Sequence, residues 1–455
     1  MEQLTQMIWD PWLLGLFLLV GTIYSFGSGF FQLFQARVWL RATVGSLFSR
    51  PVGKRRSGAL TSVQALATAL ASTMGTGSIA GVAAALCLGG PGAVFWMWVS
   101  ALLGMMTGCG EKLLSVKWQR PAPGGGLQGG PMFYLRDALG CPGLARWFAL
   151  ACIPAALIGG NLVQSASISA AVSSAFGFSR PLIALVTALL AGLVLVGGIG
   201  QVAQVCQKLV PAMAALYLLG GSAVLLLRAS AIPEAFRLIF TCALSPQAAA
   251  AGGAGWSLAA ALRHGVARGV FTNEAGLGTS AMAHGSAQVS HPARQGMWGI
   301  FEVCFATLVV CTMTALVILT AGVYQPQEMA LLAARGDLPS DALGAPLTLR
   351  SFSLVLGPAG SWIVSVSLIL FAFSSILGWS CYGQQGLRFL LGDDRMLGPY
   401  RALFLITALL GGFVPLAPLW PMVDLSSALL AIPNLIALIL LAPQALTCLR
   451  SWPGK

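Results

Sequence analysis

Residues 273–278, Asn-Glu-Ala-Gly-Leu-Gly, place a carboxamide, a carboxylate and two glycines inside a long apolar region. A glycine lowers helix stability by about 1 kcal/mol relative to alanine, so two glycines within three positions favour a break in the helix. A carboxylate near the centre of a bilayer costs about 2.5–3.5 kcal/mol on insertion scales. We therefore predict a ligand site at Glu274. The alternative is that Glu274 only forms an ion pair with Arg268, which precedes it by six residues.

A second glycine-rich segment, residues 67–81, carries a cluster of hydroxyl side chains beside Gly75 and Gly77. A dinucleotide fingerprint is excluded here because no strand precedes the glycines and no acidic residue follows them in a βαβ unit. Close helix packing through small residues does not explain the hydroxyls. A broken helix exposes carbonyls that suit sodium or an ammonium group, and N–H groups that suit a carboxylate. A zwitterionic amino acid fits both ends.

Ser374 and Ser375 are adjacent hydroxyls in another apolar segment. Such a pair can supply oxygen ligands to a hard cation. The alternative is that each hydroxyl bonds to the carbonyl one turn earlier. Trp379 follows in the same segment and either closes a pocket or packs in the core.

The composition is that of a membrane protein. The chain has 455 residues, of which 57% are hydrophobic and 8% charged, whereas soluble proteins carry about 25% charged residues. The net charge of +12 comes from basic residues in short loops between apolar runs, so the predicted partner is the lipid bilayer and not nucleic acid. The ten cysteines form no CxxC pair and the three histidines show no metal spacing, so we predict no metal and no cofactor.

Runs of about 20 apolar residues predict eleven transmembrane helices in an all-α polytopic fold. They lie at about 12–33, 62–87, 92–117, 145–174, 181–199, 208–228, 256–282, 296–323, 356–383, 399–417 and 425–447.

The basic residues predict the orientation of these spans. With the N-terminus outside, 18 Lys and Arg residues fall in or beside the cytoplasmic segments and 5 fall outside. We therefore predict an outer N-terminus and a cytoplasmic C-terminus in a bacterial cytoplasmic (inner) membrane.

The eleven spans divide into one plus five plus five. The second and seventh spans are both glycine-rich in the middle, which is typical of an inverted-repeat transporter. The predicted units are an extra N-terminal helix (1–34), a basic cytoplasmic loop (35–60), a first five-helix repeat (61–228), an extracellular connection (229–255), a second repeat (256–447) and a cytoplasmic tail (448–455).

Several long motifs resemble the alanine or glycine:cation symporter family, the sodium:alanine symporters, and they occur in the family's order between about residues 15 and 445. The resemblance implies the LeuT-type fold of the amino acid–polyamine–cation superfamily. The motifs begin at Gly75 (Gly-Thr-Gly-Ser-Ile-Ala-Gly-Val), Leu88 (Leu-Gly-Gly-Pro-Gly-Ala-Val-Phe-Trp-Met-Trp), Gly129 (Gly-Gly-Pro-Met-Phe-Tyr), Gly160 (Gly-Asn-Leu-Val-Gln-Ser), Arg268 (Arg-Gly-Val-Phe-Thr-Asn-Glu-Ala-Gly-Leu-Gly), Cys311 (Cys-Thr-Met-Thr-Ala-Leu-Val-Ile-Leu) and Ile432 (Ile-Pro-Asn-Leu-Ile-Ala-Leu).

The resemblance also implies roles for matching positions. The amino acid site would comprise Thr76, Gly77, Ser78, Asn161, Gln164, Asn273, Gly276 and Trp379. The sodium site would combine backbone oxygens of Thr73 and Gly75 with Ser374 and Ser375, and Glu274, Glu302 and Arg268 would serve coupling or gating.

Two positions depart from the family pattern. Ser78 stands where the family usually has Asn, and Ala306 stands where it often has an acid. Glu302 lies four residues before Ala306, on the same helical face. We hypothesise that Glu302 replaces the missing acid; the alternative is that it lies in water near the cytoplasmic end of its helix. Proton coupling therefore stays open beside sodium.

Three further charged or titratable residues are interpreted from their places near predicted cytoplasmic ends. Glu111 and Lys112 are expected to be anchors or a gate ion pair at the cytoplasmic face, and His284 a loop or interface residue.

These observations predict a secondary active symporter that imports alanine or glycine with a cation by alternating access. A membrane-embedded enzyme is disfavoured because the chain has no metal triad and no convincing Ser/His pair. A channel is disfavoured because no polar filter is visible. A non-transporting amino acid sensor on the same scaffold, or a proton-coupled transporter, remains as an alternative.

Overall fold

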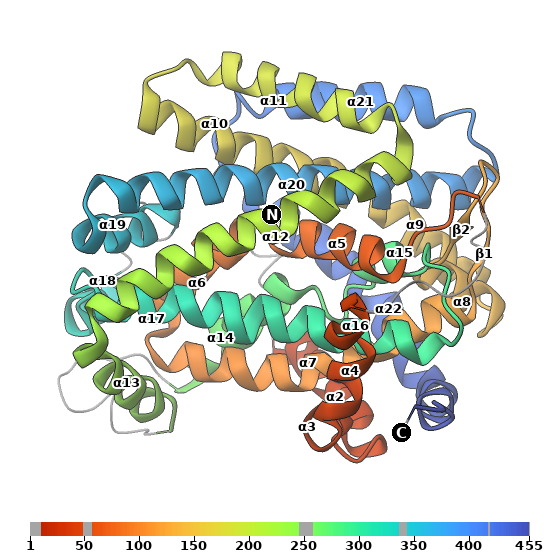
Figure 1. The fold of residues 1–455 in the computed structure, drawn as a ribbon, viewed down its shortest axis with the longest axis horizontal. Helices are drawn as coiled ribbons and strands as arrows, with labels where there is room; N and C mark the ends of the chain where they lie inside the picture. Colours follow the sequence, from red (N-terminus) through yellow and green to blue (C-terminus); the bar gives the residue numbers. More distant parts are fainter. Residues whose placement is uncertain (1–10, 49–56, 245–257, 336–343, 417–418, 455) are drawn as a thin grey trace.

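The computed structural model describes residues 11–48, 57–244, 258–335, 344–416 and 419–454, and this part of the chain is almost entirely helical (Figure 1). Within it, six helices are long and apolar enough to cross a membrane. Four of them are single helices: α7 (Gly92–Lys117), α12 (Gly198–Leu227), α20 (Pro358–Leu391) and α22 (Trp420–Arg450). The fifth is formed by α9 (Pro142–Leu157), η3 (Ile158–Leu162) and α10 (Val163–Phe176) in sequence, and the sixth by α16 (Pro292–Val303), η6 (Cys304–Cys311) and α17 (Thr312–Thr320). The segments η3 and η6 are π-helical.

Three further predicted spans are shorter helices. They are α2 (Pro11–Gly27), α11 (Arg180–Leu195) and α21 (Leu397–Leu410). The two remaining spans, the second and the seventh, are interrupted as predicted. The second is α5 (Ser62–Thr73), the 3-10 turn η2 (Thr76–Ser78) and α6 (Ala80–Gly89); the seventh is α14 (Leu258–Asn273) and α15 (Thr279–His284).

Segments predicted as loops contain additional short elements. One of these, α13 (Ile232–Leu244), buries Ala235, Ile239 and Ala243 at four-residue spacing, which is an amphipathic pattern shorter than a span. α3 (Phe31–Phe34) lies at the end of the first predicted span, separate from α2. The other short elements are α4 (Ala36–Ala42), η1 (Val44–Phe48), α8 (Pro131–Asp137), η4 (Ala229–Ala231), α18 (Pro326–Arg335), α19 (Ala345–Leu356) and the hairpin of β1 (Arg120–Pro121) with β2 (Leu127–Gln128). Five of the basic residues that support the predicted orientation lie outside the described residues: Arg50, Lys54, Arg55, Arg56 and Lys455.

The two broken helices run in opposite directions. Leu60, just before α5, forms a parallel bridge with Ala287, just after α15. Its N–H donates to the Ser286 carbonyl at 3.0 Å, and its carbonyl accepts from the Gln288 N–H at 3.0 Å. The start of one broken helix therefore lies beside the end of the other, so α5 packs on α15 and α6 packs on α14.

Spans five apart in the sequence also pack against each other. The described pairs are α7 with α16, α9 with α20, and α11 with α21. Together with the antiparallel broken helices, these contacts are the arrangement that an inverted five-helix repeat requires.

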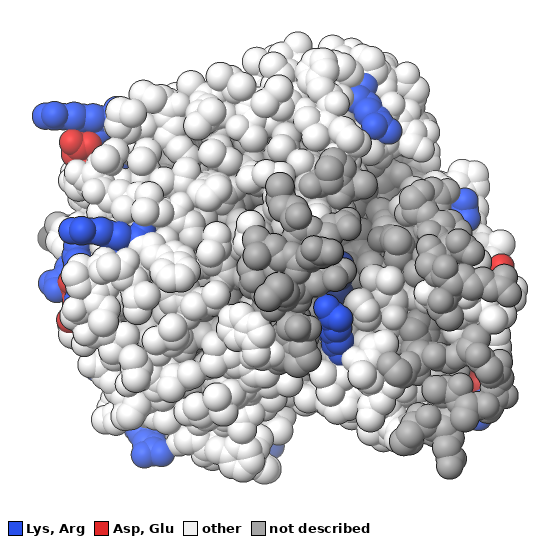
Figure 2. Space-filling model, turned by 180° about the vertical axis from the view of Figure 1, so that it is seen from behind, with Lys and Arg blue, Asp and Glu red and all other residues white. Residues whose placement is uncertain are grey.

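The surface carries an apolar belt. In Figure 2 the visible middle of the molecule carries few charged residues, and most of the visible Lys, Arg, Asp and Glu lie toward the left and right edges, where the long helices end. Leu193 of α11, Val196 just after that helix and Leu226 of α12 are among the large apolar side chains left exposed. Such a belt is what a helical bundle presents to lipid tails.

Candidate functional site

The first break leaves the end of α5 without its usual helical partners. A capping box of Thr61 and Gln64 starts the helix, and the helix ends at Thr73, before Gly75. The carbonyls of Ala71 and Ser72, in the last turn, lack the N–H groups that a longer helix would supply.

Two hydroxyl groups of α20 donate hydrogen bonds to those carbonyls. Ser374 donates to the Ala71 carbonyl at 3.1 Å, and Ser375 donates to the Ala71 and Ser72 carbonyls at 3.1 and 3.2 Å. Ser374 also bonds within its own helix, to Phe371, which was the alternative reading. Four oxygens from two helices thus gather at one point, and a hard cation is held by oxygens of these kinds.

This arrangement depends on a glycine at position 75. A Cβ there would lie 2.7 Å from the Ser375 hydroxyl, which is closer than a carbon can approach without displacing it. The carbonyls that the serines contact are those of Ala71 and Ser72. The Gly75 carbonyl, predicted with that of Thr73 as a sodium ligand, accepts from the Ser78 N–H at 3.3 Å.

The second break is held in an unusual backbone conformation. Glu274 has φ +53° and Gly276 has φ +99°. Positive φ is uncommon for a residue with a side chain, and such residues gather at functional sites. The Thr279 hydroxyl donates to the Glu274 carboxylate at 2.5 Å, so the side chain spans the break. Among the described residues no ion pair joins Glu274 to Arg268, whose guanidinium lies 6.0 Å from the centre of the Phe271 ring.

A carboxylate from α7 holds the same break. Glu111 Oε1 accepts the backbone N–H groups of Gly276 and Gly278 at 2.9 and 3.0 Å, and the Asn434 side-chain amide of α22 at 2.6 Å. The Asn434 amide also donates to the Gly276 carbonyl at 2.9 Å. Glu111 is fully buried, and the predicted ion pair with Lys112 is present at 3.4 Å inside the protein. An anion at the N-terminus of a half-helix is stabilised by the N–H groups it receives.

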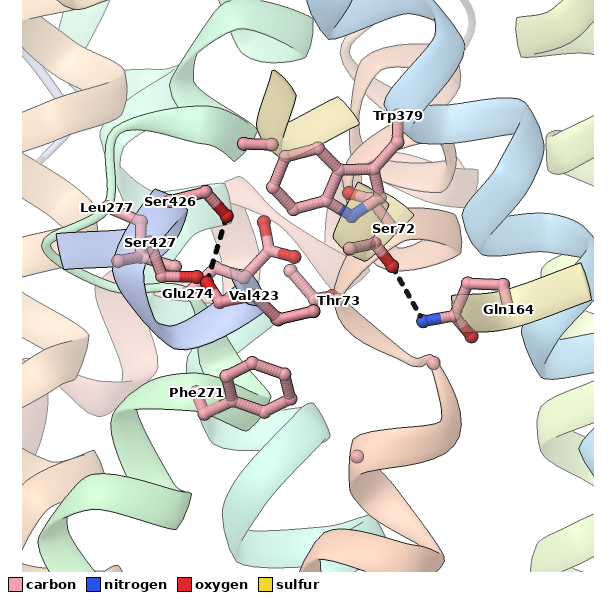
Figure 3. Close-up of a pocket in the computed structure, with 14 residues that line it drawn as sticks. Ser72, Thr73, Gln164, Phe271, Glu274, Leu277, Trp379, Val423, Ser426 and Ser427 are labelled. Atoms are coloured by element: carbon pink, nitrogen blue, oxygen red, sulfur yellow. Dashed lines mark hydrogen bonds between the residues drawn. The ribbon is translucent and has the colours of Figure 1, made fainter. Parts of the chain in front are cut away.

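A cavity lies between the two breaks (Figure 3). The space open to the centre of a water molecule inside it is about 40 Å³, so the cavity has room for water. In Figure 3 the Trp379 and Phe271 rings lie on opposite sides of the Glu274 carboxylate. The lining residues are Ser72, Thr73, Gly75, Gly77, Ala155, Gly159, Gln164, Phe271, Glu274, Leu277, Trp379, Val423, Ser426 and Ser427.

The cavity includes only some of the predicted site residues. Thr73, Gly75, Gly77, Gln164, Glu274 and Trp379 line it. Ser374 and Ser375 lie next to it, behind Gly75. The remaining predicted residues do not appear in its lining: Thr76, Ser78, Asn161, Asn273, Gly276, Arg268 and Glu302.

The residues outside the lining have structural contacts that explain their places. Asn161 lies in the π-helical η3 and donates to the Phe404 carbonyl of α21. Asn273 accepts from the Ala275 N–H at 3.0 Å and donates to Thr307 at 3.2 Å, so it stabilises the break itself. The Ser78 carbonyl accepts from Thr314.

Several lining residues were not predicted. Ser426 and Ser427 of α22 are adjacent hydroxyls in an apolar helix, the same signal that identified Ser374 and Ser375, so this pair was accessible to sequence reasoning. Phe271 precedes the break by three residues and gave no separate signal. The Ser72 hydroxyl bonds to Tyr382 at 2.6 Å, a contact between α5 and α20.

Behind the second break lies a buried charged cluster. Lys112 Nζ is 3.4 Å from Glu111 and 3.5 Å from Glu302, and His284 Nε2 is 3.1 Å from Glu302. All four side chains are fully buried. The alternative that Glu302 lies in water is therefore wrong, and so is the assignment of His284 to a loop, because His284 ends α15 inside the protein.

Comparisons with known proteins agree with this geometry. A sequence model of the sodium:alanine symporter family matches residues 1–455. The sodium/alanine symporter AgcS of Methanococcus maripaludis is 38% identical over 439 residues, which cover 96% of this chain and 92% of that protein. The probable sodium/glutamine symporter GlnT of Bacillus subtilis is 30% identical over 446 residues, 98% of this chain and 88% of that protein.

A solved structure shares the fold. The manganese transporter of Eremococcus coleocola, in complex with an aromatic bis-isothiourea compound, matches with a TM-score of 0.53 at 14% identity. The match covers 88% of this chain and 81% of that chain.

Proposed function

Because this chain belongs to the sodium:alanine symporter family, and is therefore a cation-coupled amino acid transporter and not an enzyme, we propose that it imports alanine or glycine together with sodium by alternating access. Membership of the family gives the class of transport. The substrate, the ion and the direction are the proposal.

The observation that carries the proposal is the contact between α20 and the end of α5. Ser374 and Ser375 point their hydroxyls at the carbonyls of Ala71 and Ser72. A sodium ion at this point replaces the hydroxyl-to-carbonyl bonds with ion–oxygen contacts and ties the two helices together. Ion binding then stabilises the conformation in which the neighbouring cavity is complete, which is how a differential affinity couples two sites.

The size of the cavity supports a small substrate. Its volume is about 40 Å³, and its walls include Gly75, Gly77 and Gly159, with Trp379 closing one side. Glycines at three positions of the wall and an indole across one side favour a substrate with a small side chain over glutamine, the amino acid for which the Bacillus subtilis relative is named. Alanine or glycine is therefore favoured for this chain.

The two ends of the cavity suit the two charges of an amino acid. The Glu274 carboxylate faces the ammonium group, and the backbone N–H groups near Gly77, at the start of η2 and α6, face the carboxylate. Thr76 contributes through that backbone, whereas the Ser78 N–H already donates to the Gly75 carbonyl. Gln164 of α10 adds a side-chain amide to the lining. A buried carboxylate paired with the substrate's ammonium avoids the cost of an isolated charge, several kcal/mol.

The proposed setting is a bacterial cytoplasmic membrane with the N-terminus outside. The 18-to-5 bias of basic residues supports it. In this orientation the bridge between Leu60 and Ala287 lies on the cytoplasmic side, and α13, α18 and α19 lie on the outer side.

The proposal is tested with the purified chain in proteoliposomes. Labelled alanine and glycine are supplied with an inward sodium gradient, an inward proton gradient, or neither. We expect accumulation with sodium alone. Accumulation with protons alone would contradict sodium coupling while keeping the transporter class. Binding of alanine without accumulation under any gradient would contradict transport and support a sensor.

A further inference from the structure

Glu302 belongs to a buried polar cluster that does not line the cavity. Its Oε2 atom lies 3.1 Å from His284 Nε2 and 3.5 Å from Lys112 Nζ. The three residues come from three elements, since Glu302 lies in α16, His284 in α15 and Lys112 in α7. All three side chains have no exposed surface.

The charges of this cluster do not balance without a further positive charge. Glu111 and Glu302 share one lysine, Lys112, at 3.4 and 3.5 Å. Glu111 is satisfied as an anion, because it also accepts two backbone N–H groups and the Asn434 amide. Among the described residues, Glu302 accepts no backbone N–H, and its polar neighbours are Lys112, the His284 imidazole and the Ser280 hydroxyl. A buried carboxylate without a positive partner is strongly disfavoured. A proton on His284 supplies that further charge and gives an imidazolium beside the Glu302 carboxylate.

Gln295 is placed to serve either protonation state of His284. Its amide nitrogen lies 2.6 Å from His284 Nδ1, and its Oε1 atom has no hydrogen-bond partner among the described residues. With the NH2 group toward the ring, the amide donates to a neutral imidazole. After a half-turn of the amide, the oxygen faces the ring and accepts from the Nδ1–H of an imidazolium. The second ring nitrogen faces Glu302 in both states.

A proton fits this site better than a metal ion. The contacts are already of hydrogen-bond length, and the Lys112 ammonium lies beside both carboxylates and repels a cation. No group of three or more His, Cys, Asp or Glu side chains with metal-binding geometry occurs in the described part of the chain.

The other titratable groups near His284 come from the elements packed on α15. Glu274, at the break, interacts electrostatically with Lys112, Glu111 and Glu302, and it faces the cavity. Tyr382 of α20 and Tyr134 of α8 are buried phenols in the same region. Residues 62–73 of α5 carry no titratable side chain. Lys112 is thus the cation that Glu111 and Glu302 share.

We propose that His284 and Glu302 form a proton-binding site that makes transport depend on pH. The proton comes from the solvent and returns to it, and no other bond is made or broken. α15 begins beside the cavity, where Thr279 bonds to Glu274, and it ends at His284. There the proton strengthens the contact between His284 and Glu302 of α16. When the proton leaves, Glu302 and Glu111 compete for Lys112, and the hold of α15 on α16 weakens. The site is separate from the cation site at Ser374 and Ser375.

The direct test is nitrogen NMR of the full chain in lipid nanodiscs with labelled histidine. The chain has three histidines, so His264 and His291 serve as internal references. Between about pH 5 and about pH 9, the range in which histidines titrate, we expect the two ring nitrogens of His284 to change from imidazolium to neutral imidazole. The Glu302→Gln variant should lack the imidazolium signal at the pH where the wild type shows it. A wild-type His284 that stays in one neutral tautomer throughout would overturn the proposal.

Transport gives the second readout. Sodium-driven uptake by the wild type should fall as pH rises through that range, by up to about tenfold per pH unit for a single titrating site. His284→Gln should flatten this profile, while His264→Gln, on α14, should keep it. An unchanged profile in His284→Gln would also overturn the proposal. The NMR measurement needs no substrate, so its failure is separable from a failure of sodium-driven uptake.

Discussion

Glu111 and Gly276 are joined across two helices, because the carboxylate Oε1 of Glu111 accepts the backbone N–H of Gly276 at 2.9 Å. The two residues are 165 positions apart in the sequence. This contact places a full negative charge of α7 on the unwound segment of the seventh span, next to the cavity. The break is therefore held from outside by α7 as well as by its own glycines.

Removing that carboxylate should destabilise the protein. Glu111→Ala leaves two buried N–H groups and the Asn434 amide without this acceptor, and each unsatisfied buried donor costs about 1–3 kcal/mol. We expect a clear fall in the thermal unfolding midpoint in detergent, followed by tryptophan fluorescence, and loss of uptake. Glu111→Gln keeps one acceptor oxygen and should fall between Ala and wild type. Glu328→Gln, on the exposed face of α18, is the control. Equal midpoints for Glu111→Ala and the wild type would show that the contact contributes nothing.

The serine pair should determine the dependence on sodium. Loss of one oxygen ligand worth about 1.4 kcal/mol weakens ion affinity about tenfold. We expect Ser374→Ala and Ser375→Ala each to raise the sodium concentration for half-maximal uptake by about that factor or more. Ser380→Ala is the matched control, because Ser380 is a buried serine of the same helix that bonds within that helix. If the double variant Ser374→Ala with Ser375→Ala kept the sodium dependence of the wild type, this would contradict cation binding at the two serines.

Gly276 should not tolerate a side chain. Its φ of +99° is disfavoured for any residue with a Cβ, and a Cβ there would lie 2.4 Å from the Phe17 ring. Strained backbone of this kind costs about 1–3 kcal/mol, so Gly276→Ala should lower the unfolding midpoint and uptake. Adding Phe17→Ala removes the clash but not the backbone strain, so recovery should be partial. Gly15→Ala, with open space around the new methyl, should be neutral or slightly stabilising. Full recovery in the double variant would show that steric contact alone matters.

The absence of a side chain at Gly160 should determine how much space the cavity leaves for the substrate. A Cβ at this position would lie 2.2 Å from Trp379 Cγ, so Gly160→Ala must displace the indole, which lines the cavity. We expect competition assays to show alanine uptake reduced more than glycine uptake. Gly143→Ala, at the open start of α9, is the control. Equal loss for the two amino acids would indicate a folding defect, and no loss would place Trp379 outside the substrate site.

The sequence alone determined the class of protein, the helical membrane fold and the two interruptions. Hydropathy over about 20 residues and the helix-breaking tendency of glycine act between chain neighbours, so both can be read from a linear string. The predicted span at 92–117 coincides with α7, and the family assignment from motifs is confirmed. The pairing of Ser374 and Ser375 with α5 agrees in its helices, while the carbonyls are those of Ala71 and Ser72.

The tertiary structure decided which polar residues meet. Glu111 and Lys112 stand near basic residues at the end of a span, which indicates a membrane surface, yet α16 packs on that part of α7 and both side chains are buried. His284 and Glu302 show no local motif, and Asn161 follows a family motif but faces α21 from a π-helical turn. Burial of a charge depends on contacts among helices far apart in the chain. No local pattern of residue types encodes these contacts. The charged cluster and the contact between Glu111 and Gly276 are therefore seen only in the tertiary structure.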